Sequence, residues 1–418
     1  MQKFFQNLWE FLKNNPYEIL FWILGTAAVL WLALNLLRAI YHHQQAHKLV
    51  YLRITLPRDD SPKDKDKETE KDFREKISIM AQFFSNLHET SELNIWNKLK
   101  VAILKHNIFS FELVGHEKLL DFYVTTPPYY QELLEKQITS YYPSADIEPI
   151  KPYEFQTKDS KIKGYYAYQY QKYWFPIKTY KVIENDPLND LTNIFTKMED
   201  DEIAVIQVVI RPRTSHRWNR KAEEFGEAFF KGKKHGGFKI PFLGPILNVL
   251  KGIFLGFEKM ETEGKQDGGG YVRMLQSKEE VAKRIGEKSS QSGFDTAIRL
   301  LTSAKTEKRA EDMVNSIIVG LNLFKDPAAN WFQTKRIFFI DSINDKLFLY
   351  NFKNRFIENH FLFLGEKQSL FVEDELASLY HFPSSKYNYS PNIRWLDYKV
   401  LPPPVELPTE GIILGNNM

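Results

Sequence analysis

Histidine and carboxylate pairs are the residues of this sequence with the most obvious capacity for chemistry. His43 and His47 are four residues apart, a spacing that puts two imidazoles on one helical face and suits a metal ion. They follow an apolar run, so histidines at a membrane interface are the competing interpretation. The carboxylates at 373–375 would be favoured in a first helical turn by the helix dipole alone. We therefore predict neither a catalytic nor a metal centre.

Motifs for nucleotide binding and for nucleophilic catalysis are missing from the sequence. No Gly-x-x-x-x-Gly-Lys-Ser/Thr occurs, and residues 286–289 and 365–368 lack its upstream glycine. The three glycines at 268–270 lack the strand-to-helix context of a dinucleotide loop. There is no Gly-x-Ser-x-Gly elbow and no His-Glu-x-x-His. Because the chain has no cysteine, it has no disulfide, thiolate or zinc–cysteine site. The sequence thus predicts a protein that is not an enzyme and needs no cofactor.

A basic stretch is the strongest candidate for a binding surface. Residues 211–239 hold nine lysines and arginines against three glutamates, and residues 240–257 are apolar but broken by glycine and proline. Such a sequence suits an anionic membrane surface, and its basic part suits nucleic acid. Packing on the domain and a re-entrant or spanning segment are the alternatives. The candidate contact residues are Arg211, Arg213, Arg217, Arg220, Lys221, Lys231, Lys233 and Lys234.

An uncharged apolar run near the N-terminus positions the rest of the chain. Residues 19–37 contain no charge and as a helix would reach about 29 Å, close to the hydrocarbon thickness of a bilayer. Trp22 and Trp31 lie within the run and Arg38 ends it, as expected for a membrane anchor. A buried core helix or a cleaved signal peptide fits less well. A slight excess of Lys and Arg after the run favours a cytoplasmic C-terminal part.

The order of predicted elements after the anchor indicates an α+β protein. A hydrophobic content of 43% suits packed domains, and a net charge of +3 is too small to indicate a nucleic-acid partner by itself. Apolar spacing predicts strands at 48–56, 108–114, 118–125 and 146–150 and helices from about 69 and over 129–140, with a tight turn at Gly115–His116. This β-α-β-β-α-β order is ferredoxin-like.

The same order recurs, with an interruption. Strands are predicted at 164–180, 202–211, 294–304 and 330–336, and helices at 186–198 and 307–324, with a charged helix at 277–288 before the third strand. An alternating region at 338–352 and a helix capped by Ser369 follow. The expected domains are an amphipathic segment and anchor (1–45), a first ferredoxin-like domain (46–152), a second (153–336) with an insertion at 211–293, and a small C-terminal α/β extension with a Pro-rich connector (337–418).

The C-terminal part carries a family resemblance. Residues 375–383 (Glu-Leu-Ala-Ser-Leu-Tyr-His-Phe-Pro), the three prolines at 402–404, Leu407-Pro408 and residues 411–416 (Gly-Ile-Ile-Leu-Gly-Asn) stand in this order. They resemble the region ahead of the motor domain in membrane-anchored conjugative-transfer ATPases of candidate-phyla bacteria, which are type IV secretion, coupling-protein-like proteins. The resemblance covers nearly all of the chain. It implies a cytoplasmic location and a place in a secretion or DNA-transfer machine, but not ATPase activity, because the phosphate loop is missing.

The sequence and the resemblance together predict a non-enzymatic scaffold or docking subunit with a single-pass anchor in the cell membrane. Because the chain ends where the family's motor domain would begin, we expect the P-loop ATPase on a separate chain, with other secretion-system subunits as further partners. Assembly into an oligomer and contact with DNA are also expected. The alternative is a module that binds nucleic acid or anionic membrane through residues 211–239.

Overall fold

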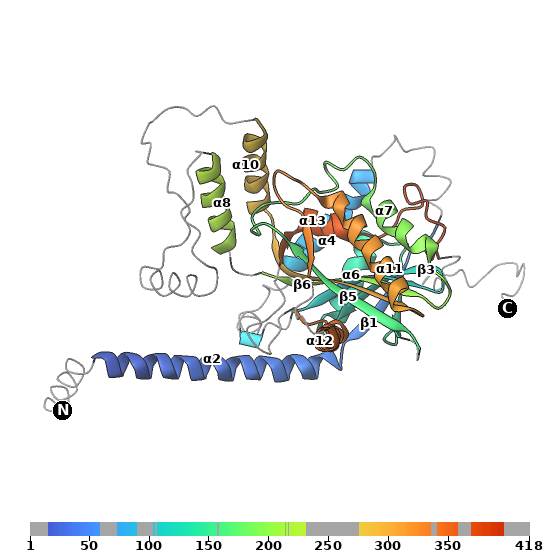
Figure 1. Ribbon diagram of the computed structural model, residues 1–418. Coiled ribbons are helices and arrows are strands. Elements are labelled where there is room, and N and C mark those ends of the chain that lie inside the picture. Colours follow the sequence, from blue (N-terminus) through green and yellow to red (C-terminus); the bar gives the residue numbers. More distant parts are fainter. Residues whose placement is uncertain are drawn as a thin grey trace, which may run out of the picture.

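The computed structural model describes residues 16–58, 73–89, 103–104, 107–156, 159–213, 215, 217–230, 276–335, 341–357 and 369–396. Within these residues the chain forms one nine-stranded antiparallel sheet with helices on both faces. A single long apolar helix, α2 (Pro16–Ala46), extends from the sheet domain at the N-terminus (Figure 1). The predicted α+β class with one N-terminal apolar helix is confirmed.

The first run of elements occupies one half of the sheet. Its strands lie in the order β4-β1-β3-β2, and each adjacent pair is antiparallel. The predicted apolar face of the first helix is buried, from Ile77 through Phe84 to Leu87. The elements are β1 (Val50–Thr55), α4 (Phe73–Glu89), β2 (Phe109–His116), β3 (Leu119–Thr126), the 3-10 turn η2 (Pro128–Tyr130), α6 (Gln131–Tyr141) and β4 (Asp146–Ile150).

The second run occupies the other half in the mirrored order β6-β7-β5-β8, again antiparallel throughout. A short strand from the C-terminal part, β9 (Ser369–Val372), also pairs with β7. The other elements are β5 (Lys161–Gln169), α7 (Pro187–Asn193), η3 (Ile194–Lys197), β6 (Ile203–Pro212), α8 (Arg217–Phe230), α10 (Gln276–Ser289), β7 (Gly293–Ala304), α11 (Glu307–Gly320), η4 (Leu321–Phe324), β8 (Phe332–Lys335), α12 (Asp341–Asn354) and α13 (Glu373–Leu379).

The two runs meet at β2 and β6, which pair over eight residues from Phe109–Ile210 to His116–Ile203. Every residue of β6 is buried, as its mostly apolar composition predicts, and the buried residues include Gln207 and Arg211. Successive residues of a strand point to opposite sides of the sheet, so β6 contributes side chains to both faces. Ile206 and Val208 belong to the core on one face, and Val205 belongs to the core on the other.

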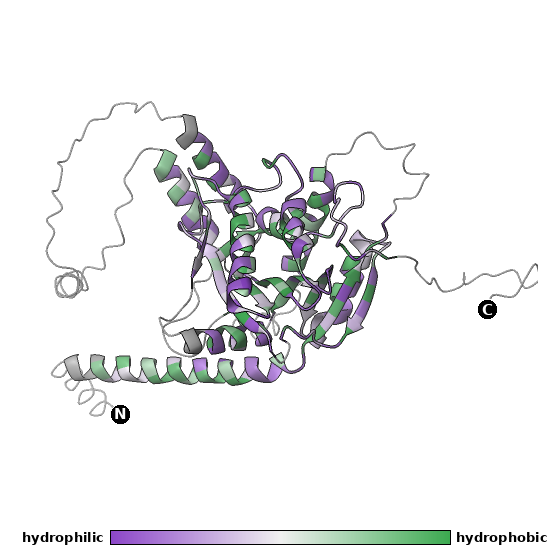
Figure 2. Cartoon of the chain, turned by 45° about the vertical axis from the view of Figure 1, so that its right-hand side comes forward, coloured by the Kyte–Doolittle hydropathy of each residue, from purple (hydrophilic) through white to green (hydrophobic). Residues whose placement is uncertain are grey.

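The sheet carries a core on each face. The larger core lies under α4, α6, α7, α11 and α13, and the smaller is formed where Phe348 and Phe352 of α12 pack against Tyr166 and Leu301. Figure 2 shows hydrophobic residues along most of α2, whereas the helices of the body alternate between hydrophobic and hydrophilic residues. The helix α2 therefore lacks the polar face that a helix packed on a soluble domain presents to water.

The hairpin turn differs from the prediction. It lies at Glu117 and Lys118, both with positive φ (51° and 61°), and Gly115 stays within β2. Gly115 is required by packing, because a Cβ there would lie 2.3 Å from the ring of Phe195. The expected turn at Gly115–His116 is therefore wrong, and Gly115 is required instead by its contact with Phe195.

Replacing Lys118 by glycine is expected to stabilise the protein by about 1 kcal/mol, since glycine adopts a positive φ without the Cβ clash that lysine suffers. The urea midpoint of unfolding measures the change. Lys118 pairs with Asp200 only at the exposed surface, so loss of that contact should cost little. A lower midpoint for Lys118→Gly would contradict this account of the turn.

The structure differs from three other expectations. β5 ends at Gln169 rather than at 180, because the backbone amides of Ile177 and Tyr180 bond to the side chains of Glu375 and Ser378 instead of to a neighbouring strand. The alternating region at 338–352 is largely helix α12, whose Phe348 and Phe352 lie one turn apart and face the sheet. Ser369 begins β9, and the short helix starts four residues later.

Candidate functional site at the anchor junction

The exposed surface of α2 is that expected of a membrane anchor. Among the described residues, one helical stretch, Leu24–Ala46, is long and apolar enough to cross a membrane. Trp22 and Trp31 are 69% and 51% exposed, and the apolar window is not buried inside the protein at all. The helix of 31 residues is about 46 Å long, which exceeds the hydrocarbon core of a bilayer by several turns.

The C-terminal turns of α2 are bound to the body of the protein. Arg38 donates from Nε to the carbonyl of Ile103 at 2.6 Å, and His42 Nε2 lies 2.6 Å from the carbonyl of Leu104. The ring of His42 is buried and lies against Phe356, just after α12. The junction therefore fixes the direction of the apolar helix relative to the sheet. Arg38, predicted as an interfacial anchor residue, makes one of these contacts.

A buried ion pair lies next to the junction and joins β2 to the segment that follows α12. Arg355 donates from Nε and Nη2 to the two carboxylate oxygens of Glu112, both at 3.0 Å, and from Nη1 to the hydroxyl of Tyr51 at 2.9 Å. Glu112 also accepts from Ser110 and Tyr153. Burial alone would raise the pKa of Glu112, but Arg355 and these hydrogen bonds hold that pKa below its usual value. The pair thus stays ionised inside the protein.

The predicted histidine pair comes together without forming a metal site. Nε2 of His43 and Nε2 of His47 are 3.4 Å apart, and the hydroxyl of Tyr350 lies 3.2 Å from Nδ1 of His43. The ring of His43 stacks on Tyr350 of α12. In the parts of the chain that the structure describes, no group of three or more histidines and carboxylates could hold a metal ion. Here His43 contributes to the junction.

The basic candidate residues are only partly available for contact. Arg211 is buried and donates to Asp295 at 2.9 Å, and Arg213 pairs with the other oxygen of the same carboxylate. On α8, Arg217, Arg220 and Lys221 are exposed. The remaining candidates Lys231, Lys233 and Lys234, and the apolar stretch 240–257, lie outside the described residues. Contact with nucleic acid or lipid through this stretch stays a prediction.

The carboxylate cluster at 373–375 is structural. Glu375 is buried with Lys288 at 2.8 Å, and it also accepts from the amides of Ile177 and Val372. Asp374 accepts from Gln291, and Glu373 from the amide of Ser292. Burial raises the pKa of Glu375 and lowers that of Lys288. These contacts attach the end of the insertion to α13, so the cluster does more than complement a helix dipole.

An aspartate–histidine pair was not predicted. The carboxylate of Asp186 accepts from His381 Nε2 at 2.9 Å, from Asn388 and from the amide of Leu188, so that Asp186 is the N-cap of α7. His381 Nδ1 donates to the carbonyl of Ala377. Both ring nitrogens therefore face oxygen atoms of the protein, which leaves His381 no free nitrogen to act as a base.

The charge of Asp186 gives a pH-dependent prediction. Burial would raise the pKa of Asp186, but His381, the Leu188 amide and Asn388 together hold it below the usual value. The stabilisation is therefore complete above about pH 4, the unfolded value, and is lost as pH falls through the lower folded pKa. Asp186→Asn should cost about 1–3 kcal/mol at pH 7. Urea unfolding at several pH values should show the gap to the unmodified protein closing below pH 4; a constant gap would contradict the assignment.

Comparison with known proteins gives a family and no relative of known function. A search of curated proteins finds no match to the chain. A family described as a domain of unknown function, DUF8128, matches residues 68–395, which include the first run of elements from α4 onward, the second run with its insertion, and α13. The match covers well over half of the sequence, so the chain belongs to the DUF8128 family.

Proposed function

We propose that the chain is a non-enzymatic docking subunit held in the cell membrane by α2, with its body in the cytoplasm. The observation that carries the proposal is the junction itself: an exposed apolar helix whose last turns are bound to the body through Arg38 and His42. Because these contacts hold the body in a fixed orientation to the membrane, its surface could present a docking site to a partner protein. The resemblance of residues 375–383 to transfer ATPases supports a place in a type IV secretion or conjugative DNA-transfer machine.

The fold assignment is part of the same proposal. The four strands of each run can be numbered 1 to 4 in chain order. Read from the outer edge of the sheet inward, the first run (β4-β1-β3-β2) and the second run (β8-β5-β7-β6) then both have the order 4-1-3-2. Together with the β-α-β-β-α-β element order, this supports two ferredoxin-like units joined edge to edge. The helices α8 and α10 then belong to an insertion between the second and third strands of the second unit.

The topology can be tested with single cysteines, because the chain has none of its own. A cysteine at Lys136, an exposed position on α6, should react with a membrane-impermeant maleimide only after cells are lysed. The protein should remain in the membrane fraction after carbonate extraction. Labelling in intact cells would contradict the cytoplasmic location, and extraction by carbonate would contradict the anchor.

The partner is tested by native pull-down of the full-length protein in mild detergent, followed by mass spectrometry. Recovery of a separate P-loop ATPase or of other transfer-system subunits is the expected result. A control with Arg38→Ala and His42→Ala keeps the apolar run but loosens the junction, and it should recover less of the partner. Recovery of the chain alone, under conditions that preserve other membrane complexes, would count against the transfer-machine assignment.

A second candidate function is contact with anionic lipid or nucleic acid through the exposed basic residues of α8. Figures 1 and 2 show α8 and α10 on the side of the body toward which α2 extends, which would bring α8 close to a membrane crossed by α2. A fluorophore on Arg217→Cys should shift to the blue in anionic but not in neutral nanodiscs. The same label on Lys136→Cys is the control. Equal spectra in both lipids would exclude the lipid contact, and salt-independent DNA binding would exclude the nucleic-acid contact.

A further inference from the structure

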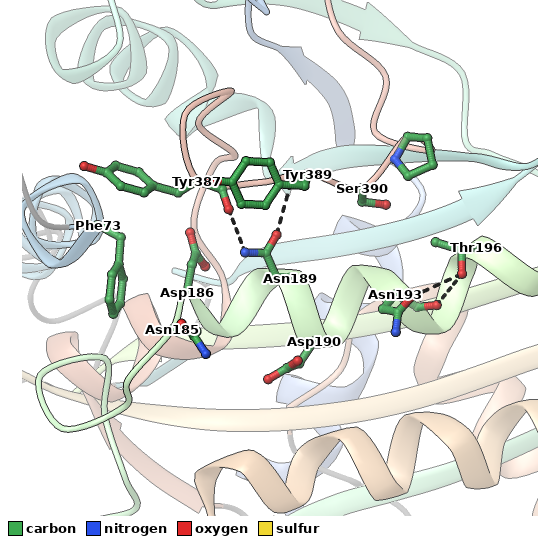
Figure 3. A pocket seen from close by; sticks show the side chains of 11 residues that line it. Phe73, Asn185, Asp186, Asn189, Asp190, Asn193, Thr196, Tyr387, Tyr389 and Ser390 are labelled. Carbon is green, nitrogen blue, oxygen red and sulfur yellow. Dashed lines mark hydrogen bonds between the residues drawn. The ribbon is translucent and has the colours of Figure 1, made fainter.

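A hollow of about 540 Å³ lies above the Asp186–His381 pair, between α7 with η3 on one side and residues 387–391 on the other (Figure 3). Phe73 of α4 is also part of its lining. In Figure 1, α7 lies on the side of the body away from the N-terminal end of α2. The hollow is thus separate from the junction, and its capacity to bind a ligand is independent of the proposed function.

The walls of the hollow are held in place by a polar network. Asn189 donates to the carbonyl of Tyr387 at 2.6 Å and accepts from the amide of Tyr389 at 3.2 Å, so one side chain fixes both ends of a short backbone segment. Asn388 bonds to Asp186 on one side and to the amide of Ser384 on the other. Because α7 and residues 387–391 are joined in this way, the hollow is formed before any ligand enters.

The lining offers exposed polar groups to a ligand. Asn185 and Asn193 contribute amide groups, and Asp190 contributes a carboxylate. The ring of Tyr389 is 79% exposed at the rim.

The charge of the lining limits the class of ligand. No lysine, arginine or histidine is among the residues that line the hollow, whereas Asp186 and Asp190 are, so phosphates and other anions would meet carboxylates there. Arg74 lies 4.8 Å from the ring of Phe73, and Lys386 lies 5.5 Å from the ring of Tyr387. An organic cation would therefore compete with a cation of the chain for stacking on these two rings.

We propose that this hollow binds a neutral saccharide. The exposed Tyr389 ring supplies a face for the C–H groups of a pyranose, and the amides of Asn185 and Asn193 and the carboxylate of Asp190 supply donors and acceptors for its hydroxyl groups. A few convergent polar groups around a preformed hollow of this size are typical of a small-molecule site.

The test uses the full-length protein in lipid nanodiscs, since common glycoside detergents would compete for the site. Glucose, N-acetylglucosamine and their β-1,4-linked disaccharides are titrated by saturation-transfer difference NMR and calorimetry. Glucose 6-phosphate, triglycine and lysine methyl ester serve as anionic, peptide and cationic probes. At least one neutral sugar should bind with a dissociation constant of about 1 mM or tighter, and better than all three of these probes.

The variant Tyr389→Ala should weaken sugar binding about tenfold or more, because it removes the stacking face. Tyr129→Ala is the matched control, since Tyr129 is similarly exposed before α6 and lies outside the hollow, and it should bind as the unmodified protein does. Thermal unfolding establishes that both variants are folded. The proposal is overturned if no neutral sugar binds, if Tyr389→Ala binds unchanged, or if triglycine or lysine methyl ester binds more tightly, which would assign the hollow to peptides or cations.

Discussion

Arg355→Met should destabilise the protein by about 3–5 kcal/mol, because the carboxylate of Glu112 would remain buried without its cation. Glu112 has no exposed surface, and Arg355 supplies two of its hydrogen bonds. The same change removes the bond to Tyr51 in β1, so the segment after α12 would lose one of its contacts with the sheet. Urea unfolding followed by tryptophan fluorescence measures the loss.

Two further variants make this result specific. Arg53→Met removes an arginine from the exposed pair with Glu148 and should cost less than about 1 kcal/mol. Adding Glu112→Gln to Arg355→Met should restore part of the lost stability, because the uncompensated charge is gone. Hydrogen exchange in α12 should quicken in the single variant. A cost below about 1 kcal/mol for Arg355→Met would show that Glu112 can be neutralised or hydrated in place.

Glu375→Leu should cost about 3–5 kcal/mol, since it leaves the buried ammonium of Lys288 without a counterion and the amides of Ile177 and Val372 without an acceptor. Because Lys288 lies near the end of α10, the damage should begin where the insertion meets β9 and α13. Chemical unfolding measures the total cost, and limited proteolysis should show earlier cleavage between α8 and α10.

The companion to this variant is Lys288→Met combined with Glu375→Leu. Replacing both members of a buried pair by apolar residues of similar size often costs little, so the double variant should recover most of the stability. Lys283→Met is the control on the same helix, because Lys283 is exposed and pairs only distantly with Glu287, and it should cost less than about 0.5 kcal/mol. A double variant as unstable as Glu375→Leu alone would mean that the amide contacts, not the charges, hold the insertion.

The local pattern of the sequence predicted most helices and strands. An element that buries one face shows apolar residues at a regular spacing, and a fully buried strand is mostly apolar along its length. The recurrence of apolar residues in α4 at helical spacing and the mostly apolar composition of β6 leave few alternatives. The difference at α12 has a physical reason. Its apolar residues do not mark out one helical face in the sequence, and the helix is recognised only in the fold, where Phe348 and Phe352 pack against the sheet.

The contacts that form the candidate sites could not be predicted in the same way. Glu112 and Arg355 are 243 residues apart in sequence, and Asp186 and His381 are 195 apart. A single sequence does not indicate that residues so far apart come into contact. Each of them, considered alone, has the character of an ordinary surface charge or helix cap. The apolar run of α2 was evident from composition, but the attachment of its last turns through Arg38 and His42 required the fold.

The pairing of β2 with β6 delays completion of the sheet while the chain is being synthesised. The N-terminal run of elements leaves the ribosome first, and the edge of β2 then has no neighbour until residues 203–212 have been made. The larger core waits longer still, because Tyr380, which contacts Phe111 and Phe122, is near the end of the described chain. A nascent or prematurely ended chain would therefore present a long apolar strand edge beside the membrane, where chaperones or other unfinished chains could pair with it.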